Sequence, residues 1–139
     1  MKERERHLLE AVENLLRIRH ECSCSIISEC GLPDMTTRQV SYLRLIDEQG
    51  EISFSRLAEV TGTSKPTVTE MINRCARMAC VRRERSPDDR RIRYIRLTEK
   101  GRTIARADHD ALRRTIERMM TSLDDQEMDH LIELLGKVR

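Results

Sequence analysis

The spacing of apolar residues changes once along this chain, and that change limits the folds open to it. Through most of the 139 residues, apolar side chains recur every three or four positions, as on one face of an amphipathic helix. In Val81–Arg85 and Arg91–Leu97 the pattern becomes alternating or β-branched, with the turn sequence Ser-Pro-Asp-Asp between them. The pattern predicts a mainly α-helical protein with one small β-hairpin.

Four helices are expected before the hairpin. Their expected ranges are 8–30, 36–49, 55–60 and 64–78, with a short strand at 51–53. Thr36 and Gln39 have the spacing of a capping box at the start of the second helix, and Thr63 or Ser64 caps the fourth. Pro66 is acceptable in the first turn of that helix, where its missing N–H has no partner to lose. The helices at 55–60 and 64–78, followed by the hairpin, predict a helix-turn-helix with a β-hairpin wing.

Two further helices are expected after the hairpin. Thr98 caps a long one that reaches about Thr121, and Asp124 with Glu127 opens the last. The last helix carries an apolar stripe that we expect to be buried: Leu131, Leu134, Leu135 and Val138. One small winged helix cannot cover the apolar faces of both terminal segments, so a second copy of the chain is expected to do so. We therefore expect a single domain over 1–139, with dimerisation helices at 8–34 and 104–139 flanking a winged helix-turn-helix at 35–103.

Charge is distributed unevenly. Residues 64–106 hold 13 basic and 5 acidic side chains, whereas residues 1–63 hold 8 and 11, and residues 107–139 hold 5 and 8. A basic central segment between acidic ends predicts a polyanion as the partner. Aromatic residues make up only 2% of the chain, which argues against an all-β sandwich and against a stacking platform for single-stranded nucleic acid.

Several features predict a soluble, cytoplasmic protein with no membrane partner. The longest stretch without a charge, Cys22–Ser28, is far below the roughly 18 residues that a membrane span needs. The charged start of the chain is unlike a signal peptide. In such a compartment the five cysteines are expected to be reduced thiols.

The fourth helix has two chemically opposite faces. Its inward face is apolar, and its outward face carries the candidate DNA-contacting residues Ser64, Lys65, Thr67, Thr69, Asn73 and Arg74. Short hydroxyl side chains near a helix start can approach phosphates closely, and the helix N-terminus itself attracts them. Asparagine and arginine can make bidentate contacts with adenine and guanine in the major groove. Glu70 has two open roles here, accepting from cytosine or holding a neighbouring basic side chain.

The hairpin is rich in arginine. Seven arginines fall within it: Arg82, Arg83, Arg85, Arg90, Arg91, Arg93 and Arg96. Their mutual repulsion is unfavourable unless an anion is bound, and arginine at a hairpin tip suits the negative potential of a narrow minor groove. Asp88 or Asp89 can orient a tip arginine by pairing with it. The arginines at the tip, with one of these two acids, are therefore candidate DNA-binding residues.

The chain resembles the MarR family of winged-helix transcriptional regulators. The matching residues are Thr36-x-x-Gln39, Leu57-Ala58-Glu59, Ser64-Lys-Pro-Thr-Val-Thr69, and Asp89-Arg90-Arg91 followed by Leu97-Thr98-Glu99-Lys100-Gly101. The resemblance covers roughly Leu8 to Val138. It implies a homodimer that presents two winged helices to a pseudo-palindromic double-stranded operator. It also implies that Arg91 enters the minor groove, that Asp89 positions it, and that residues 64–74 contact bases and phosphates. Asp89, Arg90 and Arg91 therefore join the candidate DNA-binding residues.

The thiols depart from the family pattern. Cys75 and Cys80 replace large apolar residues and are expected to be buried, and Ala79 stands where glycine is common. Cys22, Cys24 and Cys30 have three open interpretations: packing, redox sensing or metal binding. On one helix Cys22 and Cys24 point about 200° apart, so no disulfide between them is expected within the chain. The spacing of the three cysteines also matches no standard zinc site.

The sequence favours a repressor over other classes of protein. Family members are mostly repressors released by small lipophilic anions or by cysteine oxidation, so a small-molecule effector is expected here as well. The chain has no Gly-rich phosphate loop, HExxH or GxSxG motif, and its four histidines are scattered. We therefore expect neither catalysis nor a cofactor. An activator, an architectural DNA-binding protein and a protein–protein adaptor remain as alternatives.

Overall fold

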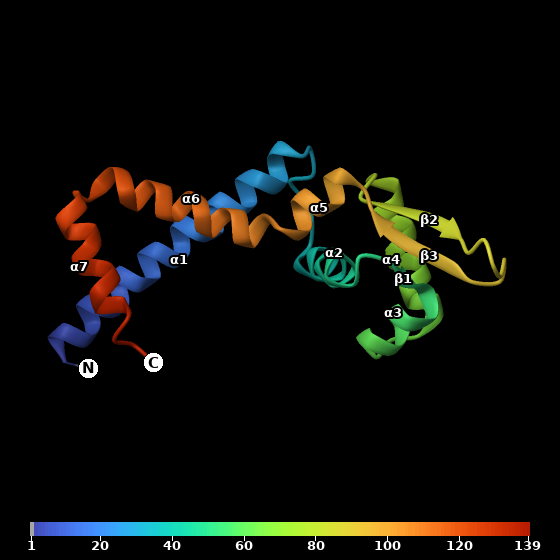
Figure 1. Cartoon of the computed structure of the whole chain (residues 1–139), viewed down its shortest axis with the longest axis horizontal. Coiled ribbons are helices and arrows are strands. Elements are labelled where there is room, and N and C mark those ends of the chain that lie inside the picture. Colours follow the sequence, from blue (N-terminus) through green and yellow to red (C-terminus); the bar gives the residue numbers. More distant parts are fainter. Residues whose placement is uncertain (1) are drawn as a thin grey trace. The chain divides into compact units, whose positions relative to one another are not determined.

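The computed structural model describes residues 2–139 as a mainly helical chain with one small sheet (Figure 1). The elements are α1 (Glu3–Glu29), α2 (Thr37–Gln49), β1 (Ile52–Ser53), α3 (Phe54–Thr61), α4 (Lys65–Arg77), β2 (Val81–Arg85), β3 (Arg93–Leu97), α5 (Glu99–Ala105), α6 (Ala107–Ser122) and α7 (Asp125–Leu135). They form two compact units. Cys24–Ala107 is called the winged body, and the helical residues up to Ser23 together with Asp108–Arg139 are called the terminal helices.

The sheet confirms the predicted wing. Its three antiparallel strands have the order β1-β3-β2, and Ile52 and Arg83 both lie opposite Ile95. The strand β3 begins at Arg93, two residues later than expected, because the preceding residues close the turn. There the N–H of Ile92 donates to the carbonyl of Asp89 at 3.0 Å. The hairpin is therefore shorter than predicted, with a longer tip.

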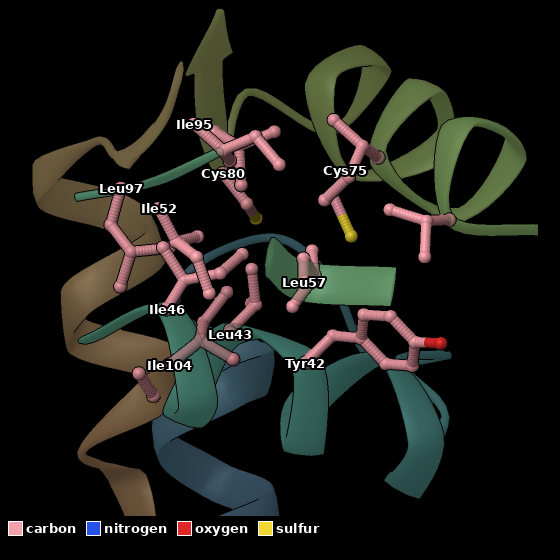
Figure 2. Packing of buried hydrophobic residues seen from close by; sticks show 14 of the residues in the cluster. Tyr42, Leu43, Ile46, Ile52, Leu57, Cys75, Cys80, Ile95, Leu97 and Ile104 are labelled. Atoms are coloured by element: carbon pink, nitrogen blue, oxygen red, sulfur yellow. The ribbon is translucent and has the colours of Figure 1, made fainter. Parts of the chain in front are cut away.

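The core of the winged body is formed by apolar residues from α2, α3, α4, α5 and the sheet, several of which are labelled in Figure 2. Leu43, Ile46, Leu57, Ile72, Ile95 and Ile104 have no exposed surface. Helical spacing puts such residues on one face of each helix, and in β3 the buried Ile95 and Leu97 lie two positions apart, on the same face of the sheet. The core therefore holds α4 and the hairpin against one scaffold.

A tight turn joins α4 to the hairpin. The N–H of Cys80 donates to the carbonyl of Cys75 at 2.9 Å, and the N–H of Ala79 donates to that of Ala76 at 3.0 Å. These two bonds define a Schellman motif, which requires a left-handed residue at its centre. Ala79 occupies that position with a φ of 59°. Cys75 and Cys80 are both fully buried, as predicted for thiols that pack as small apolar side chains.

The start of α5 is fastened to the same turn. Thr98 donates through its hydroxyl to the carbonyl of Ala79 at 2.6 Å and through its backbone N–H to that of Cys80 at 3.0 Å. Gly101 lies so close that an added Cβ would be 2.0 Å from the carbonyl oxygen of Cys80. This contact accounts for the glycine in the Leu97-Thr98-Glu99-Lys100-Gly101 segment.

The prediction of one long helix from Thr98 to about Thr121 is wrong, because this segment forms two helices, α5 and α6. α5 ends at Ala105, and its C-cap Arg106 leaves helical geometry with a φ of −98° and a ψ of 4°. The guanidinium of Arg106 makes two hydrogen bonds of 3.0 Å to the carboxylate of Asp47 on α2. No glycine or proline marks this break, and a periodic apolar pattern carries no information about such a distant ion pair.

The terminal helices bury little within one chain. The capping box of Asp124 and Glu127 is present at the start of α7, as predicted. However, α7 contains no buried residue, and Leu134 and Leu135 are 44% and 59% exposed. Val138 lies beyond the end of α7 and is exposed, so the predicted burial of this stripe does not occur in the single chain. Among residues 2–139, no helix has the length and apolar content needed to cross a bilayer.

Candidate nucleic-acid interface

The first turn of α4 is ordered by its own side chains. Ser64, rather than Thr63, is the N-cap, and its hydroxyl oxygen accepts from the N–H of Thr67 at 3.3 Å. The hydroxyls of Ser64 and Thr67 are also 2.8 Å apart. Pro66 lies in this turn, where it fixes the backbone dihedral in the helical range. A short, pre-ordered turn with several hydroxyls is suited to close approach to a phosphate.

The two faces of α4 are separated as expected. Val68, Ile72 and Cys75 are buried, whereas Lys65 and Thr69 are exposed. The hydroxyl of Thr69 donates to the carbonyl of Lys65 at 2.9 Å, which leaves its oxygen lone pairs available to an external donor. The helix therefore presents polar groups outward from a firmly packed base.

Both predicted base-contacting side chains of the middle turn have partners. Arg74 donates to the carboxylate of Glu70 at 2.8 Å, so Glu70 takes the second of its two expected roles. Arg83 on β2 donates through Nη1 to Oδ1 of Asn73 at 2.6 Å. Sequence reasoning counted Arg83 only as one of seven hairpin arginines, because nothing in the sequence pairs it with a residue ten positions away.

The hairpin tip holds one arginine in an extended but oriented state. The carboxylate of Asp89 accepts from the backbone N–H of Arg91 at 3.0 Å and from its Nε at 3.2 Å. The side chain of Arg91 is nevertheless 91% exposed. The backbone N–H groups of Asp88 and Asp89 both donate to the buried Ser86 hydroxyl, at 3.3 and 3.4 Å. Arg90 is also exposed at the tip.

A groove of about 500 Å³ lies between the hairpin and the start of α4. Its lining is Ser53, Phe54, Ser55, Lys65, Thr69, Arg83, Arg91, Ile92, Arg93 and Tyr94. Four of these side chains are cationic, which makes the groove suitable for a polyanion backbone. Sequence reasoning missed Ser53, Phe54 and Tyr94, since only the folded sheet brings the start of α3 beside the wing.

One hairpin arginine does not add to this positive surface. Arg96 donates to the carboxylate of Glu51 at 2.9 Å and lies 3.9 Å from that of Glu84. The expected repulsion among the seven arginines is thus partly relieved by acidic neighbours within the chain.

The thiols differ in accessibility. Cys24 is exposed, while Cys22 and Cys30 are partly buried. Burial raises the pKa of the Cys75 thiol to about 11, and the neighbouring Cys80 acts in the same direction. Within residues 2–139 of a single chain, no group of three histidine, cysteine or acidic side chains is arranged to hold a metal ion.

Comparison with known proteins gives concordant matches. The MarR family model matches residues 35–92. The transcriptional regulator HosA of Escherichia coli O111:H- is 31% identical over 107 residues, which are 77% of this chain and 79% of HosA.

Solved structures show the same fold. The structure of a mutant Staphylococcus aureus MepR bound to an oligodeoxyribonucleotide has a TM-score of 0.71 at 16% identity, covering 96% of this chain and 94% of the other. The structure of a mutant Escherichia coli MarR with operator DNA has a TM-score of 0.55 at 23% identity, covering 94% and 92%.

Proposed function

Because the chain belongs to the MarR family of DNA-binding transcriptional regulators, we propose that it is a homodimeric repressor of a pseudo-palindromic operator. Members of this family are regulators and not enzymes. The observation that carries the proposal is that α4 and the hairpin tip stand on one packed body, with Arg91 extended and oriented by Asp89. A dimer that occupies an operator denies the same DNA to other proteins, which is the simplest route to repression.

In this proposal α4 enters the major groove and the hairpin tip enters the adjacent minor groove. Ser64, Thr67 and Thr69 approach phosphates and base edges at the start of α4, and Lys65 neutralises phosphate. Asn73 and Arg74 read bases in the next turn. At the tip, Arg91 inserts into the minor groove with Asp89 holding it and Arg90 beside it.

The exposed apolar surface of the terminal helices supports the dimer. Leu123, Leu131 and Leu134 line an apolar hollow with a volume of about 620 Å³ on α7 and the segment before it. Large apolar surfaces of this kind are characteristic of protein–protein contacts. A second copy of the chain supplies the matching apolar face, because a two-fold interface uses the same patch on both subunits. The half-sites should then be centred about 34–36 Å apart, or a multiple of that distance.

The first test is operator binding by the wing variant Arg91→Ala. A footprint of the protein on its own upstream DNA supplies the operator. Arg91→Ala should weaken operator binding by about 1–3 kcal/mol, the range for a specific contact. Arg96→Ala is the matched control, because it removes the same charge from the same hairpin at a residue already paired with Glu51. Equal losses in the two variants, or none in Arg91→Ala, would contradict the proposed role of the tip.

A second test separates backbone contact from base reading. Lys65→Ala should weaken binding to operator and to random DNA alike and lower the salt slope by about one. Arg74→Ala should lose discrimination at particular base pairs instead. Transcription from the operator-bearing promoter distinguishes a repressor from an activator, and absence of DNA affinity would favour the adaptor.

We propose that release from DNA uses either a small ligand or oxidation at Cys22, Cys24 and Cys30. The exposed Cys24 supports the second route, because oxidants and alkylating agents reach exposed thiols first. Peroxide or diamide should lower operator affinity, dithiothreitol should restore it, and a variant with all three cysteines changed to serine should not respond. If both proteins respond alike, the effector is a small ligand. If freshly purified protein contains zinc or iron that this variant lacks, the thiols bind metal.

A further inference from the structure

The hydrogen bond between Arg83 and Asn73 connects the wing to α4. Nη1 of Arg83, in the middle of β2, donates to Oδ1 of Asn73 at 2.6 Å. Both residues belong to the winged body, and both of their backbones are fixed, one by the sheet and the other by the helix. The contact is therefore a property of the folded body rather than of a mobile loop.

The chemistry of this contact determines which way the amide faces. A guanidinium group has only donors, so the atom of Asn73 that faces Arg83 must be the carbonyl oxygen. The amide nitrogen, with two hydrogens, is then directed away from Arg83. Reversing the amide would place its two N–H hydrogens against those of the guanidinium.

This orientation changes what Asn73 can read. Asparagine recognises adenine by accepting from N6 through its oxygen while donating to N7 through its nitrogen. Here the oxygen already accepts from Arg83, whose donor-only guanidinium occupies that side of the amide, so the unobstructed group for a base edge is the donor nitrogen. The major groove offers acceptors at guanine O6 and N7, at thymine O4 and at adenine N7, but at adenine the N6 amino donor lies beside N7 and would face the guanidinium of Arg83.

We propose that Arg83 is a positioning residue that makes Asn73 a hydrogen-bond donor, so that Asn73 selects guanine or thymine rather than adenine at its base step. This inference rests on the proposed function, in which α4 lies in the major groove. Arg83 also lines the cationic groove with Lys65 and Thr69. Since a guanidinium has donors on three nitrogens, a phosphate bound in that groove can be contacted by Arg83 without breaking its bond to Asn73.

The test is selection of binding sites from a randomised half-site by the wild-type dimer and by four variants. Asn73→Ala identifies the position that Asn73 reads, as the one at which preference is lost. At that position the wild type should favour guanine or thymine, and Arg83→Ala should shift the preference toward adenine by roughly tenfold, the value of one bidentate contact. Arg83→Lys keeps a donor-only side chain of similar length and should retain the wild-type preference.

Arg85→Ala is the matched control. It removes the same charge from the same strand, two residues along, and should lower affinity for all sequences without changing any preference. A thermal unfolding curve for each variant shows that it is folded. If the wild type binds specifically but Arg83→Ala keeps its preference, or if Asn73→Ala alters no position, this inference is wrong while the proposed function stands. If the wild type shows no sequence preference at all, both are wrong.

Discussion

The winged body and the terminal helices follow the same apolar periodicity but reach different degrees of burial. In the winged body, Leu43, Ile72 and Ile95 have no exposed surface. Among the described terminal-helix residues, the buried ones are small, namely Ser23, Ala111 and Thr115, and α7 has none. The difference shows that an amphipathic pattern indicates that a face will be covered, but not whether the same chain covers it.

The largest expected effect contrasts one leucine from each region. Leu43→Ala should lower the free energy of unfolding by about 2–5 kcal/mol, because it leaves a cavity in a closed core. Leu135→Ala removes a side chain that is 59% exposed in the single chain and that the second copy covers in the proposed dimer. Its effect on the free energy of unfolding should therefore depend on protein concentration. Urea denaturation at several protein concentrations checks both. Equal, concentration-independent losses would remove the distinction between the two regions.

The next effect is on association. Leu134→Glu places a charge on the apolar hollow of α7 and should weaken dimerisation by about 1.5–3 kcal/mol, the value of burying one large apolar side chain. Sedimentation velocity measures the dissociation, and Glu133→Ala on the same helix is the control. As dimerisation weakens, the affinity of the Leu134→Glu variant for the operator should fall too, because in the proposed complex both half-sites must be engaged together. A Leu134→Glu protein that stays dimeric would place the interface elsewhere.

The thiols extend the comparison to pH. Because the pKa of Cys75 is raised to about 11 in the folded state, the unfolded chain ionises at this position first as pH rises. Its stabilising contribution is therefore complete below the ordinary thiol pKa and is lost between there and about pH 11. Each pH unit between the unfolded-state and folded-state pKa values contributes about 1.4 kcal/mol to the free energy of unfolding. The free energy of unfolding, measured from pH 8 to 11, should fall more steeply with pH for the wild type than for Cys75→Val. Parallel curves for the two proteins would contradict this prediction.

The smallest effect has the opposite sign. Ala79 holds a left-handed conformation that disfavours any residue with a Cβ, so Ala79→Gly should stabilise the protein by about 0.5–1 kcal/mol. Ala76→Gly, three residues earlier in α4, should instead destabilise it by about 1 kcal/mol. Chemical denaturation of the two variants gives the comparison. A loss of stability in both would mean that the turn does not strain Ala79.

The features predictable from sequence were those determined by neighbouring residues. The capping boxes of Thr36 with Gln39 and Asp124 with Glu127 were found because each depends on side chains three positions apart. The hairpin was found because alternation and turn residues lie within one short segment. The orientation of Arg91 by Asp89 was expected for the same reason, together with the family resemblance.

The features that escaped prediction depend on residues that only folding brings together. Arg106 and Asp47 are 59 positions apart, and their pairing coincides with the unforeseen break between α5 and α6. Arg83 and Asn73 belong to different elements, and neither has a local signal of the other. Charge and periodicity therefore predicted the candidate interface as a surface, but not the hydrogen bonds that orient its side chains.

The close contact between Gly101 and Cys80 has a consequence for the DNA that this protein can accept. It holds the start of α5 directly against the turn that joins α4 to the hairpin, and Thr98 bonds both Ala79 and Cys80 of that turn. In the proposed complex, we therefore expect the spacing between the major-groove contact of α4 and the minor-groove contact of the hairpin tip to be fixed by the protein. One base pair inserted between those two contacts moves them apart by about 3.4 Å along the duplex, a distance the protein cannot follow. We therefore expect that, within a half-site of the proposed operator, substitutions are tolerated but insertions and deletions are not.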